Sequence, residues 1–312
     1  MPKSSKMAAT ERLMKIMHGE TLINEPMSKH TTYGIGGPAL AYFYPADKED
    51  LTAILKTAHK EAIPLFFTGS GSNLLVSDNG YDGYVISLSR HFRKIEFEGT
   101  HVSVESGVMM GRLVRECIHR NLSGVESLIG VPGTVGGALR MNAGAFGYEI
   151  SNSLVKLNVV TLSGDQKEYL KEEIDFGYRY SSLKDDEIVI SASFEFQIGS
   201  PEKIKDLRRR SSINRKTSQP LQHRSAGSVF KNPTGHSSAG YYIDQAGLKG
   251  TRVGRAEISR KHANFFINHG GASSNDIVKL IRLAKKKVKE QFDVDLELEI
   301  KTLGFPPHHF DC

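Results

Sequence analysis

A dense run of glycines between residues 124 and 147 constrains this chain more than any other feature of its sequence. Seven glycines fall in this stretch, together with Pro132 and Asn142. Glycine adopts positive φ readily and lets a ligand approach the backbone, so that successive N–H groups can point at a diphosphate. The density exceeds what packing needs and is not expected in regular structure. We interpret the stretch as a ligand-binding loop; an irregular surface loop is the alternative.

A second polar loop, Gly69–Asn73, follows the short apolar and aromatic segment 64–68, which we expect to be a strand. The hydroxyls of Ser70 and Ser72 and the amide of Asn73 could complement backbone donors around an anion. Two such cradles suit a diphosphate. The loop is not a Walker A sequence, because no Gly-Lys-Ser/Thr follows, and it lacks the third small residue of the dinucleotide fingerprint.

Hydrophobic periodicity predicts an α+β chain. Apolar residues at helical spacing predict helices over 48–61, 109–121, 202–216 and 277–288, and alternation or short apolar runs predict strands over 64–68, 84–88, 95–98, 102–105, 155–161, 188–196 and 296–303. Asp47 and Asp50 resemble a capping pair at the first of these helices. A change of pattern near residue 90 and a polar region after residue 215 predict three domains, 1–90, 91–215 and 216–312.

The charge balance leaves two classes of partner open. A net charge of +6 and a pI near 9.1 suit either a nucleic acid or small phosphorylated ligands. The basic clusters at 208–216 and 285–289 fall inside predicted helices, where such runs usually form a solvated face. No aromatic residues alternate with them and no nucleic-acid-binding module is recognisable, so we favour small ligands and expect no nucleic-acid partner.

Other compositional features predict a soluble cytoplasmic protein. No run approaches the roughly 20 apolar residues that cross a bilayer, so we expect no membrane insertion. The only two cysteines, Cys117 in a predicted helix and Cys312 at the last position, do not form a disulfide framework or a metal site. We expect neither to be catalytic, and we expect no bound metal.

Six blocks of sequence resemble the UDP-N-acetylenolpyruvoylglucosamine reductase family. The first three are TTYGIGGP at 31–38, GSGSNLL at 69–75, and IGVPGTVGG at 129–137 with MNAGA at 141–145. The other three, FGYRYS at 176–181, SAGSVFKNP at 225–233, and LEIK at 298–301 with Leu303 and Gly304, resemble the catalytic blocks of that family in the same order. The resemblance covers residues 21 to 305, nearly the whole chain.

The resemblance implies a fold, a reaction and two cofactors. It implies a vanillyl-alcohol-oxidase/PCMH-type FAD-binding fold of two α+β subdomains, followed by a C-terminal α/β substrate-binding domain. The implied enzyme is a monomer that uses NADPH and FAD to reduce the enolpyruvyl ether of UDP-N-acetylglucosamine to UDP-N-acetylmuramate, a step of peptidoglycan synthesis. Hydride is expected to pass through flavin N5 to C3 of the enolpyruvyl group, with protonation of C2 by a serine.

The resemblance also assigns roles to single residues. The implied catalytic residues are Arg179 and Glu299, which would stabilise negative charge beside the substrate carboxylate, and Ser228, which would protonate C2. The implied FAD-binding residues are Tyr33, Gly34, Gly69, Ser70, Gly71, Ser72, Asn73, Leu74, Gly130, Pro132, Gly133, Thr134, Gly136, Gly137, Asn142, Ala143, Gly144 and Ala145. Weaker candidates for substrate binding are Arg215, Lys231, Asn232 and Gln245.

Three departures from the family pattern and one alternative accompany these assignments. Arg140 replaces an apolar or aromatic residue, and Lys301 replaces a frequent arginine, which leaves their local contacts open. The short span between Phe196 and the helix at 202 has no room for a tyrosine-bearing insertion, so the chain resembles the short form of the enzyme. An oxidase of the same superfold is the alternative within enzymes, and a histidine-linked flavin would distinguish it.

Overall fold

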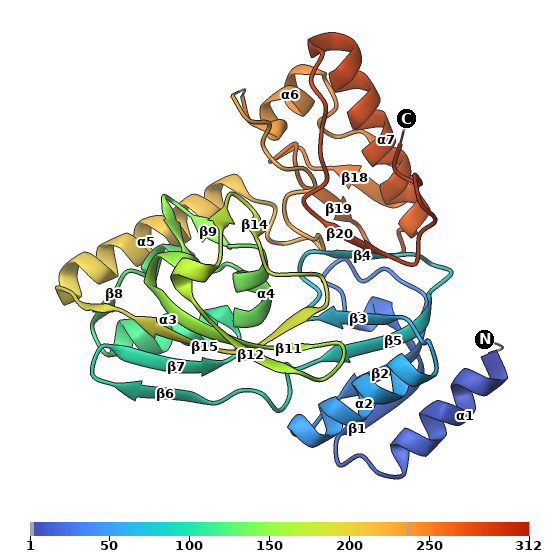
Figure 1. Ribbon diagram of the computed structural model, residues 1–312. Coiled ribbons are helices and arrows are strands. Elements are labelled where there is room, and N and C mark those ends of the chain that lie inside the picture. Colours follow the sequence, from blue (N-terminus) through green and yellow to red (C-terminus); the bar gives the residue numbers. More distant parts are fainter. Residues whose placement is uncertain (1–2, 236, 312) are drawn as a thin grey trace. The chain divides into compact units, whose positions relative to one another are not determined.

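The computed structural model describes residues 3–235 and 237–311, and Figure 1 shows the course of the chain. The chain divides into two compact units. One contains Met1–Ile23, Leu40–Ser70 and Gly83–Asn214, and the other contains Asn24–Ala39, Gly71–Asp82 and Arg215–Cys312. No helix among the described residues is long and apolar enough to cross a membrane. The predicted division into three domains stays a prediction.

A four-stranded sheet with two helices lies mostly in the first unit. Its strand order is β1–β2–β5–β3, with bounds Glu20–Pro26 (β1), Pro38–Tyr44 (β2), Tyr81–Ser87 (β5) and Leu65–Thr68 (β3). The helices are α1, Lys3–Met14, and α2, Lys48–Lys60. The apolar face of α2, which includes Leu51, Ile54 and Leu55, is buried in one core cluster with this sheet. The predicted helix at 48–61 and strands at 64–68 and 84–88 are confirmed.

A five-stranded antiparallel sheet forms the rest of the first unit's framework (Figure 1). In sheet order its strands are β12 (Gln166–Leu170), β11 (Leu154–Thr161), β15 (Glu187–Glu195), β7 (His101–Glu105) and β6 (Ile95–Glu98). Helix α3, Met110–His119, buries Leu113, Val114 and Cys117 in the core cluster of this sheet. The predicted hairpin after residue 95, the helix near 109–121 and the two long strands are confirmed.

The glycine-rich stretch contains regular structure, so that part of the sequence interpretation is wrong. Helix α4, Val135–Arg140, begins in the middle of it, and the Thr134 side chain caps the helix by accepting from the Gly137 N–H at 3.4 Å. Packing also requires glycine here, contrary to expectation. A Cβ on Gly136 would lie 2.8 Å from the Cβ of Ser106, closer than side-chain atoms pack.

Short elements complete the first unit. Three two-stranded pairs are β8 (Leu122–Ser123) with β16 (Gln197–Ile198), β9 (Gly144–Ala145) with β10 (Tyr148–Glu149), and β13 (Phe176–Gly177) with β14 (Tyr180–Ser181). The 3-10 turns are η2 (Glu126–Leu128), η3 (Ile150–Ser153) and η4 (Lys171–Glu173). Helix α5, Pro201–Ser218, confirms the helix predicted over 202–216 and continues into the segment that begins the second unit's C-terminal part.

The second unit is built around helix α7, Ser274–Phe292. Its other elements are η1 (Met27–Lys29), α6 (Ala239–Gln245), the antiparallel strands β17 (Arg252–Val253), β18 (Ala256–Ile258) and β19 (Phe266–Asn268), and the parallel pair β4 (Leu74–Val76) and β20 (Lys301–Leu303). The strand predicted over 296–303 is too long. Only its last three residues form a ladder, because the segment before them makes separate bonds to residues 229–231.

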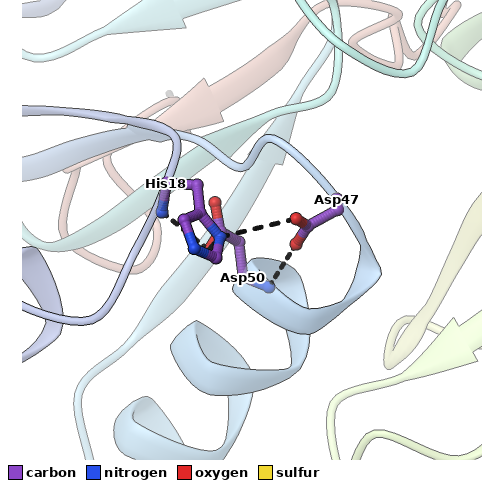
Figure 2. A group of neighbouring side chains, drawn as sticks. All are labelled: His18, Asp47 and Asp50. Atoms are coloured by element: carbon purple, nitrogen blue, oxygen red, sulfur yellow. Dashed lines mark hydrogen bonds and ion pairs between the residues drawn. The ribbon is translucent and has the colours of Figure 1, made fainter.

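A buried carboxylate near the start of α2 binds the segment that follows α1. Asp50, with 3% of its surface exposed, accepts from the backbone N–H groups of His18 at 3.0 Å, Gly19 at 2.7 Å and Ala46 at 2.9 Å. Figure 2 shows His18, Asp47 and Asp50 as one group, with Asp47 accepting from the Asp50 N–H at 2.8 Å as the N-cap of α2. Because the carboxylate oxygens of Asp50 accept from backbone N–H groups, we infer that this group stabilises the fold.

Replacing Asp50 with asparagine is expected to lower the free energy of unfolding by about 2–3 kcal/mol at pH 7, because the amide cannot accept these charge-assisted bonds. Burial alone would raise the pKa of Asp50, but the N–H groups of Ala46, His18 and Gly19 lower it below its usual value. A carboxylate whose pKa is lower in the folded than in the unfolded state stabilises the fold at pH values above its unfolded pKa. The difference in the free energy of unfolding between wild type and Asp50→Asn should therefore shrink below about pH 4.

Urea unfolding at pH 7 and pH 3 measures this difference. Asp47→Asn is the matched control, because asparagine caps helices as well as aspartate does and the His18–Asp47 ion pair is exposed. An Asp50→Asn variant as stable as Asp47→Asn at pH 7 would contradict this stabilising role of Asp50.

Candidate active site

Within the first unit, the start of the first glycine-rich loop lies against the second loop. A Cβ added to Gly69 would lie 2.6 Å from the Thr134 side-chain oxygen, so the backbone of the first loop packs directly on the N-cap of α4. Gly130 and Gly133 adopt positive φ, +77° and +125°. Glycine adopts both φ values without the steric cost that a side chain would add, so the loop can turn tightly at these positions. Gly69 and Thr134 are therefore neighbours inside this unit, and the binding of one diphosphate by both loops stays a prediction.

Three buried polar atoms at these loops lack a hydrogen-bond partner among the described residues. They are Ser70 Oγ, Ser106 Oγ and Asn142 Oδ1. Buried polar groups in native proteins are nearly always paired, so unpaired atoms gathered at ligand-type loops indicate a missing polar partner. The hydroxyls and the amide oxygen, beside glycine backbone, fit a phosphate or heterocycle of FAD. The donor and acceptor set is thus compatible with the predicted cofactor.

In the second unit, another part of the predicted cofactor set is joined by hydrogen bonds. Thr32 donates from its N–H to Gly71 O at 3.1 Å and from its hydroxyl to Ser225 O at 2.6 Å. Tyr33 is fully buried, its carbonyl accepts from Asn268, and its hydroxyl has no partner among the described residues. Burial raises the pKa of Tyr33 above its ordinary value, so the phenol stays protonated and able to donate.

The same unit brings Ser228 and Glu299 close together. The carbonyl of Val229, next to Ser228, accepts from the Glu299 N–H at 2.8 Å. The carbonyl of Glu299 accepts from Asn73 Nδ2 at 3.0 Å, which ties a predicted cofactor residue to a predicted catalytic one. Gly227 has a φ of +77°, so the chain turns immediately before Ser228. A backbone bond thus joins Glu299 to Val229, the residue after Ser228, although the two lie 70 positions apart in sequence.

Arg179 lies in the first unit, at the tip of the β13–β14 hairpin. It has a φ of +56°, an uncommon conformation for a residue with a side chain. Its guanidinium carbon lies 5.1 Å from the centre of the Tyr178 ring. Strained backbone of this kind persists only where surrounding contacts enforce it, and it is concentrated at functional sites. The meeting of Arg179 with Ser228 and Glu299 stays a prediction.

The other predicted residues have more ordinary surroundings. Lys231 donates to Glu297 at 2.5 Å, and Asn232 accepts from the Ala239 N–H at 3.1 Å. Gln245 ends α6 with an exposed side chain, and Arg215 lies half-buried in α5. The remaining cofactor candidates, Gly34, Ser72, Leu74, Pro132, Gly137, Ala143, Gly144 and Ala145, lie within the loops and short elements described above. Their ligand contacts and the substrate-binding roles stay predictions.

Sequence reasoning missed two residues that shape the site. Ser106 accepts from the Gly136 N–H at 2.9 Å through its carbonyl, while its hydroxyl is one of the unpaired atoms. Asn264 is buried, and its side chain both accepts from the Phe230 N–H and donates to the Phe230 carbonyl. Asn264 therefore fixes the segment that follows Ser228. The only signal in the sequence was a polar residue within an apolar run, Ala263 to Ile267.

The surroundings of Cys117 make its thiol a poor nucleophile. It is buried, and burial raises the pKa of its thiol to about 12, so the reactive thiolate is scarce. Cys312 lies outside the described residues.

Two family matches divide the chain between them. Residues 39–169 match a family described as an FAD binding domain, and residues 219–303 match the C-terminal domain of UDP-N-acetylenolpyruvoylglucosamine reductase. The curated reductase of that name from Clostridioides difficile is 40% identical over 94% of this chain and 96% of its own length. The chain belongs to the UDP-N-acetylenolpyruvoylglucosamine reductase family.

Further relatives agree with membership of this reductase family. The reductase from Caldanaerobacter subterraneus is 40% identical over 94% of this chain and 97% of its own length. A crystal structure of UDP-N-acetylenolpyruvylglucosamine reductase from Thermus caldophilus matches with a TM-score of 0.80 and 36% identity, over 93% of this chain and all of that one. The predicted fold class, an α+β FAD-binding fold with a C-terminal substrate domain, is confirmed.

Proposed function

We propose that this chain reduces UDP-N-acetylenolpyruvoylglucosamine to UDP-N-acetylmuramate for peptidoglycan synthesis, with FAD bound and NADPH as the hydride donor. FAD-dependent reduction of this substrate is the activity of the family to which the chain belongs. FAD, when bound, supplies a hydride carrier between NADPH and the enolpyruvyl group. A nucleotide sugar and NADPH are cytoplasmic metabolites, so the proposed enzyme acts in the cytoplasm, as a monomer.

The glycine-rich loops are the proposed holders of FAD. Ser70 Oγ, Ser106 Oγ and Asn142 Oδ1 would complete their hydrogen bonding with polar atoms of the cofactor. The positive φ of Gly130 and Gly133 leaves backbone N–H groups free of side-chain cover, which suits close contact with a diphosphate. Tyr33 adds a protonated hydroxyl as a further donor.

Ser228 is the proposed proton donor to C2 of the substrate. After hydride reaches C3, negative charge develops at C2 and on the neighbouring carboxylate, and a hydroxyl positioned there can deliver the missing proton. The observation that supports this role is the bond between Val229 O and the Glu299 N–H, which makes the residue after Ser228 a backbone partner of the glutamate. The half-buried position of Ser228 leaves its side chain accessible.

Arg179 and Glu299 are proposed to stabilise the developing charge. The planar guanidinium of Arg179 can donate two parallel bonds to the substrate carboxylate. Glu299, in its protonated form, would donate a hydrogen bond to the same group or to a water beside it. The strained φ of Arg179 supports a role that depends on a fixed direction of the side chain. Lys231, Asn232, Arg215 and Gln245 remain the proposed contacts to the rest of the nucleotide sugar.

The absorbance of the purified protein tests the proposed function. We expect a flavin band that NADPH bleaches under anaerobic conditions and that recovers when the enolpyruvyl nucleotide sugar is added. Bleaching without recovery would refute the substrate. Denaturation in acid should release the flavin; yellow colour that stays with the precipitate would indicate a covalently bound flavin and favour the oxidase alternative.

A further inference from the structure

The C-terminal end of α4 is hydrogen-bonded to the segment that follows the hairpin of Arg179. Arg140, the last residue of α4, donates from Nη1 to the carbonyl oxygens of Leu183 at 2.7 Å and Lys184 at 2.6 Å. Its Nη2 atom donates to Asp185 Oδ1 at 2.6 Å. One guanidinium thus makes three short hydrogen bonds to three consecutive residues just beyond β14.

Two more contacts hold the hairpin itself to the same end of α4. The carbonyl of Arg140 accepts from Ser181 Oγ at 2.8 Å, and Asn142 donates from Nδ2 to the Gly177 carbonyl at 3.1 Å. Gly177 ends β13 and Ser181 ends β14, so both strands are tied. Ser181 and Asn142 are buried, with 7% and 0% of their surfaces exposed. Water therefore competes little for these bonds.

The hairpin needs such support. Each of its strands has two residues, and a hairpin of that size is not stable by itself in water. The tyrosines on either side of Arg179, Tyr178 and Tyr180, are 48% and 54% exposed, so apolar burial anchors the tip weakly. The positive φ of Arg179 adds backbone strain. The bonds to α4 thus help to hold the backbone that carries Arg179.

We propose that Arg140 is a positioning residue, which fixes the orientation of Arg179 for its contact with the substrate carboxylate. The inference rests on the role proposed above for Arg179. Thr134, the N-cap of α4, lies against Gly69, so the helix also links the hairpin to the loops proposed to hold FAD. A lysine could not replace Arg140 fully, because a single ammonium group lacks the planar fork that reaches all three acceptors.

Arg140→Met tests the proposal, because methionine keeps an unbranched apolar stem and removes the guanidinium. Amide hydrogen exchange over residues 176–185 should become faster. Flavin reduction by NADPH should stay near normal, while reoxidation by the enolpyruvyl substrate should slow roughly 10- to 100-fold, the scale of a small misplacement of a reacting group. If this variant does not fold, Arg140→Lys is used and should show the same two effects at smaller size.

Arg120→Met is the matched control. Arg120 is the C-cap residue of α3. Its Nη1 atom donates to the backbone carbonyl of Glu116 at 3.1 Å and to the Glu116 carboxylate at 2.5 Å, so it makes the same kinds of bond as Arg140. It is expected to leave both half-reactions and the exchange of 176–185 unchanged. Equal losses in Arg120→Met and Arg140→Met would overturn the proposal, as would unchanged exchange at 176–185 in Arg140→Met.

A double-mutant cycle separates this inference from the proposed function. Because Arg140 acts through Arg179, adding Arg140→Met to Arg179→Ala should slow reoxidation little further, whereas independent effects would multiply. Multiplying effects would overturn the positioning role. Normal reoxidation in Arg179→Ala alone would refute the catalytic role of Arg179 and the catalytic part of this inference with it. Faster exchange in Arg140→Met would then still identify Arg140 as the tether of the hairpin.

Discussion

Replacing Ser228 with alanine is expected to slow flavin reoxidation by the enolpyruvyl substrate by roughly 10² or more, the scale of losing a positioned general acid, while NADPH still reduces the flavin at a near-normal rate. The two half-reactions separate because the proton at C2 is needed only after hydride has reached the substrate. Ser228→Cys should retain more activity than the alanine variant, since a thiol is the better acid and occupies nearly the same place.

Rapid-mixing absorbance at the flavin band measures each half-reaction separately. Ser237→Ala is a suitable control, because Ser237 is an exposed serine nine positions further along the same unit. It should behave as wild type in both steps. Equal losses in the two half-reactions of Ser228→Ala would instead mean that the serine only shapes the turn at Gly227, and they would defeat its role as proton donor.

Replacing Gly133 with valine is expected to give a folded protein with little bound FAD. Gly133 has a φ of +125°, which a β-branched residue adopts only with a cost of about 1–3 kcal/mol. Its carbonyl accepts from the Met110 N–H at 3.0 Å. A displaced backbone at Gly133 would therefore also disturb the backbone hydrogen bonds between this loop and residues 106–110. The ratio of flavin to protein absorbance after gel filtration should fall to a small fraction of the wild-type value.

Gly164→Val controls for backbone strain alone. Gly164 has a φ of +95° in the turn between β11 and β12, and a Cβ there would meet nothing closer than a Thr52 methyl at 3.9 Å. This variant should pay a similar conformational cost and keep its FAD. Full occupancy in folded Gly133→Val, or the same loss of flavin in Gly164→Val, would remove the support for the glycine-rich loop as a cofactor site.

Local pattern predicted the elements whose hydrophobic faces are continuous. Helices α2 and α3 follow from periodicity, because each buries one regular stripe of apolar residues, whereas strands β11 and β15 follow from short apolar runs that are buried along most of their length. The strand predicted over 296–303 is wrong because it was inferred from alternation alone. Leu296 and Ile300 are buried, which produces the alternation, but the hydrogen bonds between them go to residues 229–231 outside any regular ladder. Alternation reports burial on one face and not continuous pairing.

The sequence proposes site residues, which stay a prediction, but it does not reveal the contacts that support them. Motifs pointed to Ser228, Glu299 and the glycine-rich loops, whereas the requirement for Gly136 depends on Ser106, which is 30 positions earlier in sequence. Arg140 illustrates the same limit. From sequence it was only an unexpected charge at an apolar position, and the positioning role proposed for it rests on three acceptors more than 40 residues away. Long-range partners of this kind leave no periodic signal.

The central claim is that this chain reduces the enolpyruvyl group of a nucleotide sugar, and the mass of the reaction product tests it most directly. Purified protein is incubated anaerobically with NADPH and UDP-N-acetylenolpyruvoylglucosamine, and the nucleotide sugar is analysed by mass spectrometry. We predict a product heavier by two hydrogen atoms, formed in equal amount to the NADPH consumed. Oxidation of NADPH with the mass of the nucleotide sugar unchanged would contradict the account.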